Sequence, residues 1–118
     1  MITYDKEKRM FHLRSVNTSY VFRILNDYTI EHLYYGRRLS NTVGLEYSSY
    51  KTEIKSFCSL NYESDGMMST EMVSQEYAFF GSCDMSRPSF HAQYADCSRI
   101  TKAKFVGYKI SKSKPKLN

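Results

Sequence analysis

Two runs of alternating polarity, joined by a turn signal, constrain the fold of this chain more than any other feature. Residues 18–25 (TSYVFRIL) and residues 28–35 (YTIEHLYY) each place apolar and aromatic side chains at every second position. Because successive side chains of an extended strand point to opposite faces, this spacing is typical of half-buried strands. Asn26-Asp27 lies between the runs and favours a turn. The sequence therefore predicts a β-hairpin over residues 18–35.

A helix over residues 20–34 is the competing interpretation, because four side chains also recur at helical spacing: Phe22, Leu25, Thr29 and His32. The β-branched and aromatic content favours the hairpin, and residues 9–14 (RMFHLR) predict a further strand before it. The hairpin interpretation also predicts which side chains share a face. These are Tyr20, Phe22 and Ile24 on the first strand, and Tyr28, Ile30, His32 and Tyr34 on the second.

The rest of the chain shows weaker periodicity. No single period holds from Gly36 to about Ser74, so a long loop is expected there. Short strands within or just after that loop are expected at Ile54–Leu60 and towards Met72–Val73. Three later strands are predicted, at Gln75–Phe80, residues 89–95 and residues 99–110, separated by a loop at Gly81–Pro88 and a turn at Asp96–Ser98.

Short strands with few credible helices predict a mainly β fold, specifically an antiparallel β-sandwich. About seven or eight strands are few for two full sheets, so the sandwich is expected to belong to a larger one that continues beyond Asn118. Residues 1–110 would form the partial N-terminal sandwich domain. Residues 111–118 would form a basic linker-like tail, because Pro115 cannot donate to a strand ladder and the lysines and serines solvate well.

The net charge of +5 raises the question of a nucleic-acid partner. Much of the excess lies near the C-terminal end, in six lysines: Lys102, Lys104, Lys109, Lys112, Lys114 and Lys116. Tyrosines interleaved with lysines suit single-stranded nucleic acid, but they also describe an ordinary sheet whose lysines lay their stems along apolar surface. A solvated linker is the favoured interpretation, and nucleic acid is not expected as a partner.

The three cysteines, Cys58, Cys83 and Cys97, form no CxxC pair, so neither a zinc site nor a thioredoxin-type site is expected. Reduced, partly buried thiols are favoured, with a Cys83–Cys97 disulfide as the alternative. The start of the sequence is charged from Asp5 onward and lacks the apolar segment of a signal peptide, and no run approaches membrane-spanning length. These features predict a cytoplasmic protein without a membrane partner.

Short motifs follow one another in a specific order through the last third of the chain. They are Gln75-Glu76-Tyr77, Gly81, Asp84, Arg87-Pro88, Ser98-Arg99-Ile100-Thr101, Tyr108-Lys109-Ile110 and Lys114-Pro115-Lys116-Leu117. This order resembles the N-terminal domain of bacterial α-galactosidases of glycoside hydrolase family 36. In that family a similar Lys-Pro-x-Leu run leads out of the first domain, and the chain continues well beyond it.

The resemblance implies a function for a longer parent chain. The parent would hydrolyse terminal α-galactosyl residues of melibiose- and raffinose-type sugars by a retaining mechanism with two aspartates and no metal or other cofactor. Those aspartates lie in the following barrel domain of the family, so this 118-residue chain alone is expected to be inactive. Its domain would shape the active-site entrance and support a homo-oligomer, which is a tetramer in some relatives.

Three residues are candidates for the substrate entrance: Glu53, Tyr35 and Asp84. Glu53 lies in the predicted loop, which in tetrameric relatives can reach a neighbouring active site; the alternative is an ordinary surface loop. Tyr35 stands where relatives often have tryptophan and would stack on a sugar, or pack in the interior or on a domain interface. Asp84 would contact sugar hydroxyls or a neighbouring domain, or would serve only as a turn residue.

Two further interpretations complete the prediction. His12, His32 and His91 lack metal-ligand spacing, and the first two are expected to be hydrogen-bonded, partly buried residues within strands. The alternative to an enzyme fragment is a stand-alone β-sandwich module that binds carbohydrate or another protein.

Overall fold

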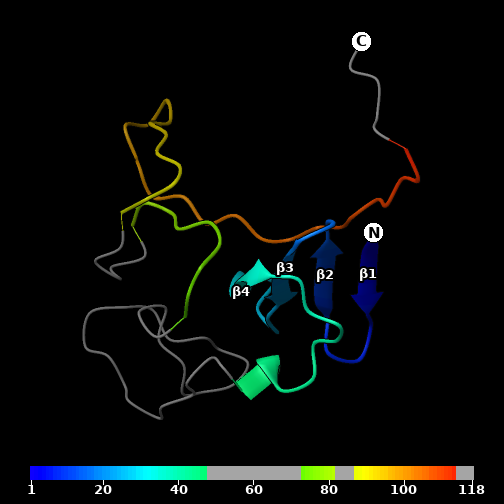
Figure 1. Cartoon of the computed structure of the whole chain (residues 1–118). Coiled ribbons are helices and arrows are strands. Elements are labelled where there is room, and N and C mark those ends of the chain that lie inside the picture. Colours follow the sequence, from blue (N-terminus) through cyan, green and yellow to red (C-terminus); the bar gives the residue numbers. More distant parts are fainter. Residues whose placement is uncertain (48–72, 82–86, 114–118) are drawn as a thin grey trace.

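The computed structural model of this chain describes residues 1–47, 73–81 and 87–113. Its centre is one antiparallel sheet in which neighbouring strands are also consecutive in sequence (Figure 1). The strands are β1 (Ile2–Asp5), β2 (Met10–Arg14), β3 (Thr18–Ile24) and β4 (Ile30–Arg37), and a short 3-10 helix, η1 (Leu45–Tyr47), follows them. The predicted mainly β, antiparallel fold class is therefore confirmed.

The hairpin predicted over residues 18–35 is formed by β3 and β4, and the competing helix over residues 20–34 is wrong. The second strand begins at Ile30, two residues later than predicted, because Tyr28 belongs to the turn. Its φ angle is 68°, and its N–H donates to the carbonyl of Leu25 at 3.0 Å. The predicted strand over residues 9–14 is confirmed as β2.

A β-bulge changes the predicted assignment of side chains to faces in β4. Val21 pairs with Tyr34, but the next residue, Phe22, pairs with His32, so Leu33 is an extra residue in the ladder. An extra residue in one strand reverses the alternation beyond it. Tyr34 therefore does not share the face of His32, which corrects the prediction that both lie on one face.

The first strand, β1, was not predicted, because the opening of the sequence is dominated by charge from Asp5 onward. It is an edge strand whose four residues pair in register with β2. The turn after it is held by Asp5, whose Oδ1 accepts from the backbone N–H groups of Glu7 at 3.0 Å and Lys8 at 3.1 Å. Charged residues thus form the turn, and the alternating segment before it is too short to predict a strand by itself.

Aromatic rings stack across one face of the sheet. The ring of Phe11 lies 4.4 Å from that of Tyr4 and 4.9 Å from that of Phe22, between centroids. Tyr108, from the distant C-terminal segment, lies 4.8 Å from Phe11 edge to face. Such pairs contribute about 0.5–1.5 kcal/mol each beyond the area they bury. The aromatic face is therefore partly covered by a segment nearly one hundred positions away.

The opposite face carries polar groups as well as apolar ones. Met10 and Val21 are buried there, and so is the carboxylate of Glu31, which is 0% exposed and paired with Arg23 on β3. Removing an ion pair from water is costly, and the attraction between the two charges offsets that cost only where both partners are well placed. Arg23 and Glu31 are directly opposite each other in the ladder, which provides that placement.

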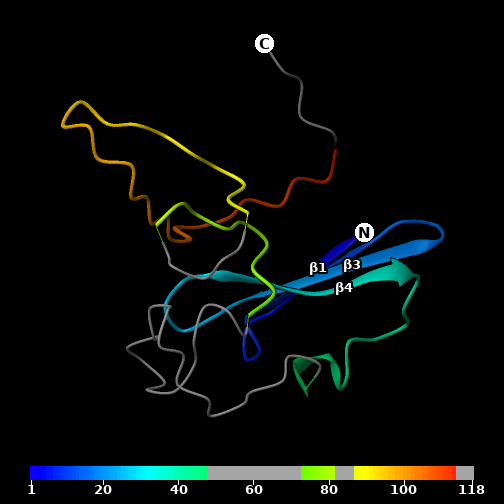
Figure 2. The same ribbon diagram turned by 90° about the vertical axis from the view of Figure 1, so that its left-hand side faces the viewer.

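The three later strands predicted at Gln75–Phe80, residues 89–95 and residues 99–110 are not formed in the described residues. Only isolated bridges occur there, Glu31 with Gln75 and Phe79 with Phe90. Residues 99–110 lie over the sheet through ring contacts instead of joining its edge, which leaves Val106 99% exposed (Figure 2). Their alternation is that of a strand, but within the described residues their backbone forms no ladder with a neighbouring strand.

Smaller predictions in this part of the chain have mixed outcomes. The turn at Asp96–Ser98 is confirmed, because the N–H of Ser98 donates to Asp96 Oδ1 at 3.0 Å and Cys97 has a φ of 65°. Cys97 is an exposed free thiol in the turn, so the Cys83–Cys97 disulfide is not formed and the prediction of partial burial is wrong for Cys97. The predicted strands at Ile54–Leu60 and towards Met72 lie outside the described residues. Within those residues, no helix is long and apolar enough to cross a bilayer.

Candidate functional site

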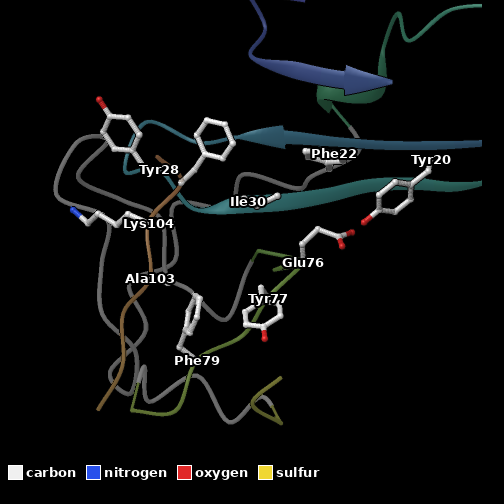
Figure 3. A pocket seen from close by; sticks show the side chains of 10 residues that line it. Tyr20, Phe22, Tyr28, Ile30, Glu76, Tyr77, Phe79, Ala103 and Lys104 are labelled. Carbon is white, nitrogen blue, oxygen red and sulfur yellow. The ribbon is translucent and has the colours of Figure 1, made fainter. Parts of the chain in front are cut away.

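A cavity of about 400 Å³ opens beside the aromatic face, where β3 and β4 meet the segments over residues 73–81 and 103–105 (Figure 3). Rings and aliphatic groups make up most of its wall: Tyr20, Phe22, Ile30, Tyr77, Phe79 and Phe105. This volume lies within the range of small-molecule sites, which are mostly apolar with a few polar groups. The polar groups are concentrated at its two ends.

The first end holds a cluster of three polar side chains from three segments. Nδ1 of His32 donates to Oε1 of Glu76 over 2.6 Å. The hydroxyl of Tyr20 also bonds to the Glu76 carboxylate and points towards it in Figure 3. Burial raises the pKa of Tyr20 well above its ordinary value, and the neighbouring Glu76 charge raises it further, since both disfavour the phenolate.

Backbone pairing with β4 positions Glu76. The N–H of His32 donates to the carbonyl of Ser74 at 2.7 Å, and the N–H of Glu76 donates to the carbonyl of Ile30 at 3.0 Å. Residues 74–76 thus lie along the outer edge of β4 and form an isolated antiparallel bridge there, between Gln75 and Glu31. Glu76 lies opposite Ile30, and Ile30 shares a face of the sheet with His32 and Tyr20, because alternate residues of a strand point to the same face. The Glu76 side chain therefore lies on that face.

At the other end of the cavity lie Tyr28 and Lys104 (Figure 3). The N–H of Phe105 donates to the carbonyl of Tyr28 at 2.9 Å, which ties the C-terminal segment to the β3–β4 turn. On its other side, the guanidinium of Arg9 lies 5.3 Å from the centre of the Tyr28 ring, in a cation–π contact. The turn is therefore held from two sides.

The chemistry of this cavity suits binding better than hydrolysis. Glycoside hydrolysis needs two carboxyl groups that flank the scissile bond. Among the described residues of its wall, Glu76 provides one carboxylate, and that carboxylate is already bonded to His32 and Tyr20. The remaining walls offer rings that can stack on an apolar or sugar face.

The three residues predicted for the substrate entrance are not brought together in the described structure. Tyr35 is 71% exposed near the end of β4, with its ring edge-on to Tyr20 at 6.2 Å between centroids, and it does not line the cavity. This exposure excludes packing in the interior of the described structure and does not distinguish a sugar contact from a domain interface. Glu53 and Asp84 lie outside the described residues.

The predicted histidine environments are confirmed. His12 is 6% exposed, and its Nε2 is 2.8 Å from the hydroxyl of Ser19. His32 is bonded to Glu76, as described above. Sequence reasoning did not single out Glu76 as a partner, although the Gln75-Glu76-Tyr77 motif belonged to the series that carried the family resemblance.

Comparison with known proteins identifies the family. Residues 28–118 match the Glycosyl hydrolase family 36 N-terminal domain, which is well over half of the chain. The chain belongs to this family. The family assignment agrees with the resemblance drawn from the motif order, and the match includes β4 and every described cavity-lining residue except Tyr20 and Phe22.

The curated relatives of this family 36 domain are α-galactosidases. The chain is 26% identical to alpha-galactosidase AgaA of Geobacillus stearothermophilus over 117 residues, and 29% identical to alpha-galactosidase 1 of Pediococcus pentosaceus over 119 residues. These matches cover 99% and 100% of the chain. The chain spans only 16% of the length of either relative.

Solved structures confirm the predicted β-sandwich fold class. Alpha-galactosidase AgaB of Geobacillus stearothermophilus superposes over 100% of the family 36 domain and 16% of its own chain, with a TM-score of 0.83 and 27% identity. A variant of AgaA from the same organism, solved in complex with raffinose, covers 92% of the domain with a TM-score of 0.78 and 28% identity. Another AgaA variant was solved with stachyose.

Proposed function

We propose that this chain is the non-catalytic N-terminal portion of an α-galactosidase that hydrolyses terminal α-galactosyl residues of melibiose- and raffinose-type sugars. The observation that carries the proposal is the end-to-end superposition on AgaB, which places the whole chain within 16% of a longer enzyme. The substrate class follows from relatives whose structures hold raffinose and stachyose. The parent would act in the cytoplasm by a retaining mechanism, and its catalytic residues would lie outside this sequence.

The domain's own contribution would be to shape the entrance of the active site and to support contacts in a homo-oligomer. Several large apolar side chains are more than three-quarters exposed, as expected of surfaces that other parts of an assembly cover: Val16, Val43, Tyr47 and Val106. Tyr35 projects from β4 in the same exposed manner. We propose Tyr35, together with Glu53 and Asp84, as candidate contacts to the sugar at that entrance.

The polar cluster of Tyr20, His32 and Glu76 would serve this function indirectly. It fastens residues 74–76, which precede the candidate Asp84 in sequence, to β4. A loop that leaves from a fixed stem loses less conformational entropy when it contacts a ligand. The cluster would therefore position the candidate Asp84 without touching substrate.

Hydrolysis of an aryl α-galactoside tests the proposal. The 118-residue chain would be assayed beside a longer protein that carries its native downstream sequence, at equal molar concentrations. We expect activity only in the longer protein. An inactive long form, or the absence of a downstream reading frame, would contradict the enzyme assignment.

The aromatic-walled cavity favours a second candidate function, a stand-alone carbohydrate-binding module. Stacking rings beside a carboxylate and a lysine are a common means of holding a sugar. Calorimetric titration of the 118-residue chain with raffinose distinguishes the two functions. Saturable binding that is lost in Tyr77→Ala favours the module, whereas absence of binding favours the enzyme fragment.

A further inference from the structure

Three arginines line an open groove of about 730 Å³ at the end of the sheet that lies away from the β1–β2 turn. Arg14 ends β2, Arg37 ends β4, and Arg38 follows directly. Asn17, in the tight turn between β2 and β3, lines the same groove. The groove is separate from the aromatic cavity, and none of its lining residues belongs to that cavity.

Backbone contacts hold these arginines in place. Arg14 pairs with Ser19, and Arg37 pairs with Thr18, on the two sides of β3. The N–H of Arg38 donates to the carbonyl of Asn17 at 2.8 Å. The guanidinium of Arg38 also donates to the carbonyl of Val16 at 3.3 Å, which fixes that side chain against the turn. A site built on paired strands is preorganised, so little entropy is lost when a ligand binds.

The charge of the groove lacks compensation in the described part of the chain. None of the three arginines forms a salt bridge there, and no carboxylate is among the described lining residues. Nε of Arg14 is buried and has no hydrogen-bond partner. Guanidinium groups stay charged at any ordinary pH, so three of them around one groove repel one another unless an anion lies between them.

We propose that this groove binds the phosphate group of a small molecule through Arg14, Arg37 and Arg38. Arginine presents a planar fork of donors that matches phosphate oxygens, and three forks can satisfy a dianion from several directions. The groove is larger than a bare phosphate needs and falls in the range of small-molecule sites, which leaves room for an organic group attached to the phosphate. The proposal is independent of the α-galactosidase assignment and goes beyond it.

Isothermal titration calorimetry on the 118-residue chain tests the site. The probes are inorganic phosphate, glycerol 3-phosphate and glutarate, at matched ionic strength and pH. Saturable binding of the two phosphates that is tighter than binding of glutarate is the expected result. Glutarate binding as tight as phosphate would overturn the proposal, because it would indicate a site for carboxylates such as those of an acidic protein surface. No saturable binding of either phosphate would also overturn it.

A pair of double variants separates the site from overall charge. Arg37→Gln with Arg38→Gln removes two charges from the groove, and Lys102→Gln with Lys109→Gln removes two exposed charges from the C-terminal segment. We expect affinity for glycerol 3-phosphate to fall about tenfold or more in the arginine variant and to stay within about twofold in the lysine variant. Equal losses in both would overturn the proposal.

Thermal unfolding shows whether the double arginine variant folds. If it does not, a conservative variant keeps the test decisive. Arg37→Lys retains the charge and the strand pairing but replaces the fork with a single ammonium group. We expect weaker phosphate binding with an unchanged unfolding midpoint. Unchanged phosphate affinity in this variant would exclude Arg37 from the site as proposed.

Discussion

The carboxylate of Glu76 lies 2.6 Å from Nδ1 of His32, although the two residues are 44 positions apart in sequence. Around this contact, two backbone hydrogen bonds fasten residues 74–76 to the outer edge of β4. An uncovered strand edge invites pairing with other chains. The contact between Glu76 and His32 therefore helps to close part of one edge of the sheet and forms one wall of the aromatic cavity.

Replacing Glu76 with glutamine should weaken the attachment of residues 74–76 to β4 and lower the pKa of Tyr20. The amide keeps the shape of the carboxylate but removes its charge, so the pKa of Tyr20 should fall towards its ordinary value, and the free energy of unfolding should fall by about 1 kcal/mol. NMR titration of ring-labelled tyrosines and urea denaturation would measure the two effects. Glu7→Gln, at an exposed turn position, should change neither, and an unshifted Tyr20 titration in Glu76→Gln would contradict the assignment.

Breaking the buried ion pair between Glu31 and Arg23 should cost far more stability than breaking a surface pair. Glu31→Gln removes the anion that pairs with Arg23, whose side chain is only 11% exposed. The free energy of unfolding is expected to fall by about 3 kcal/mol or more. The matched control is Glu46→Gln, which breaks the exposed contact between Glu46 and Lys8 and should scarcely change stability. Urea denaturation of both variants measures the difference. Similar losses would show that burial does not distinguish the two pairs.

The stability of the domain should decline in acid through His12. Burial lowers the pKa of His12 below its ordinary value of about 6.5, and the charge of Arg14 lowers it further. Between the lowered pKa of the folded chain and the ordinary pKa of the unfolded chain, the unfolded chain binds more protons. The contribution of His12 to stability is therefore full above about pH 6.5 and is lost as the pH falls through the lowered pKa. The urea midpoint should depend less on pH between pH 8 and pH 5 in His12→Gln than in the unchanged chain. In His91→Gln, which changes an exposed histidine, the slope should persist.

Gly81 should tolerate a side chain poorly, because it combines a φ of 98° with close neighbours. A Cβ there would lie 3.0 Å from the Ile100 side chain and 3.2 Å from its Cα. We expect Gly81→Ala to lower the free energy of unfolding by about 1–3 kcal/mol. Gly107→Ala, where nothing lies within 4 Å of the added Cβ, should be nearly neutral in the same thermal unfolding assay. A neutral Gly81→Ala would show that this segment moves freely relative to Ile100.

Local sequence patterns determined the centre of the fold and the family. Alternation in residues 18–35 with Asn26-Asp27 between the runs predicted the β3–β4 hairpin, because side-chain alternation and turn chemistry act between near neighbours. The motif order around Glu76 and Tyr108 indicated glycoside hydrolase family 36, which the match over residues 28–118 confirmed. The same local reasoning predicted that His12 and His32 would be hydrogen-bonded within strands.

Tertiary structure alone decided the features that depend on distant partners. The bulge at Leu33 reverses the face of Tyr34, and alternation within β4 cannot reveal it, because a bulge is defined by what lies opposite on β3. Residues 99–110 alternate like a strand, yet within the described part of the chain they pair with no strand and lie across the aromatic face through ring contacts. The attachment of Glu76 to His32 and the gathering of three arginines at one end of the sheet likewise follow from strand register. A short-range pattern sets which conformations are favourable, but only the folded chain determines which hydrogen-bonding partners are within reach.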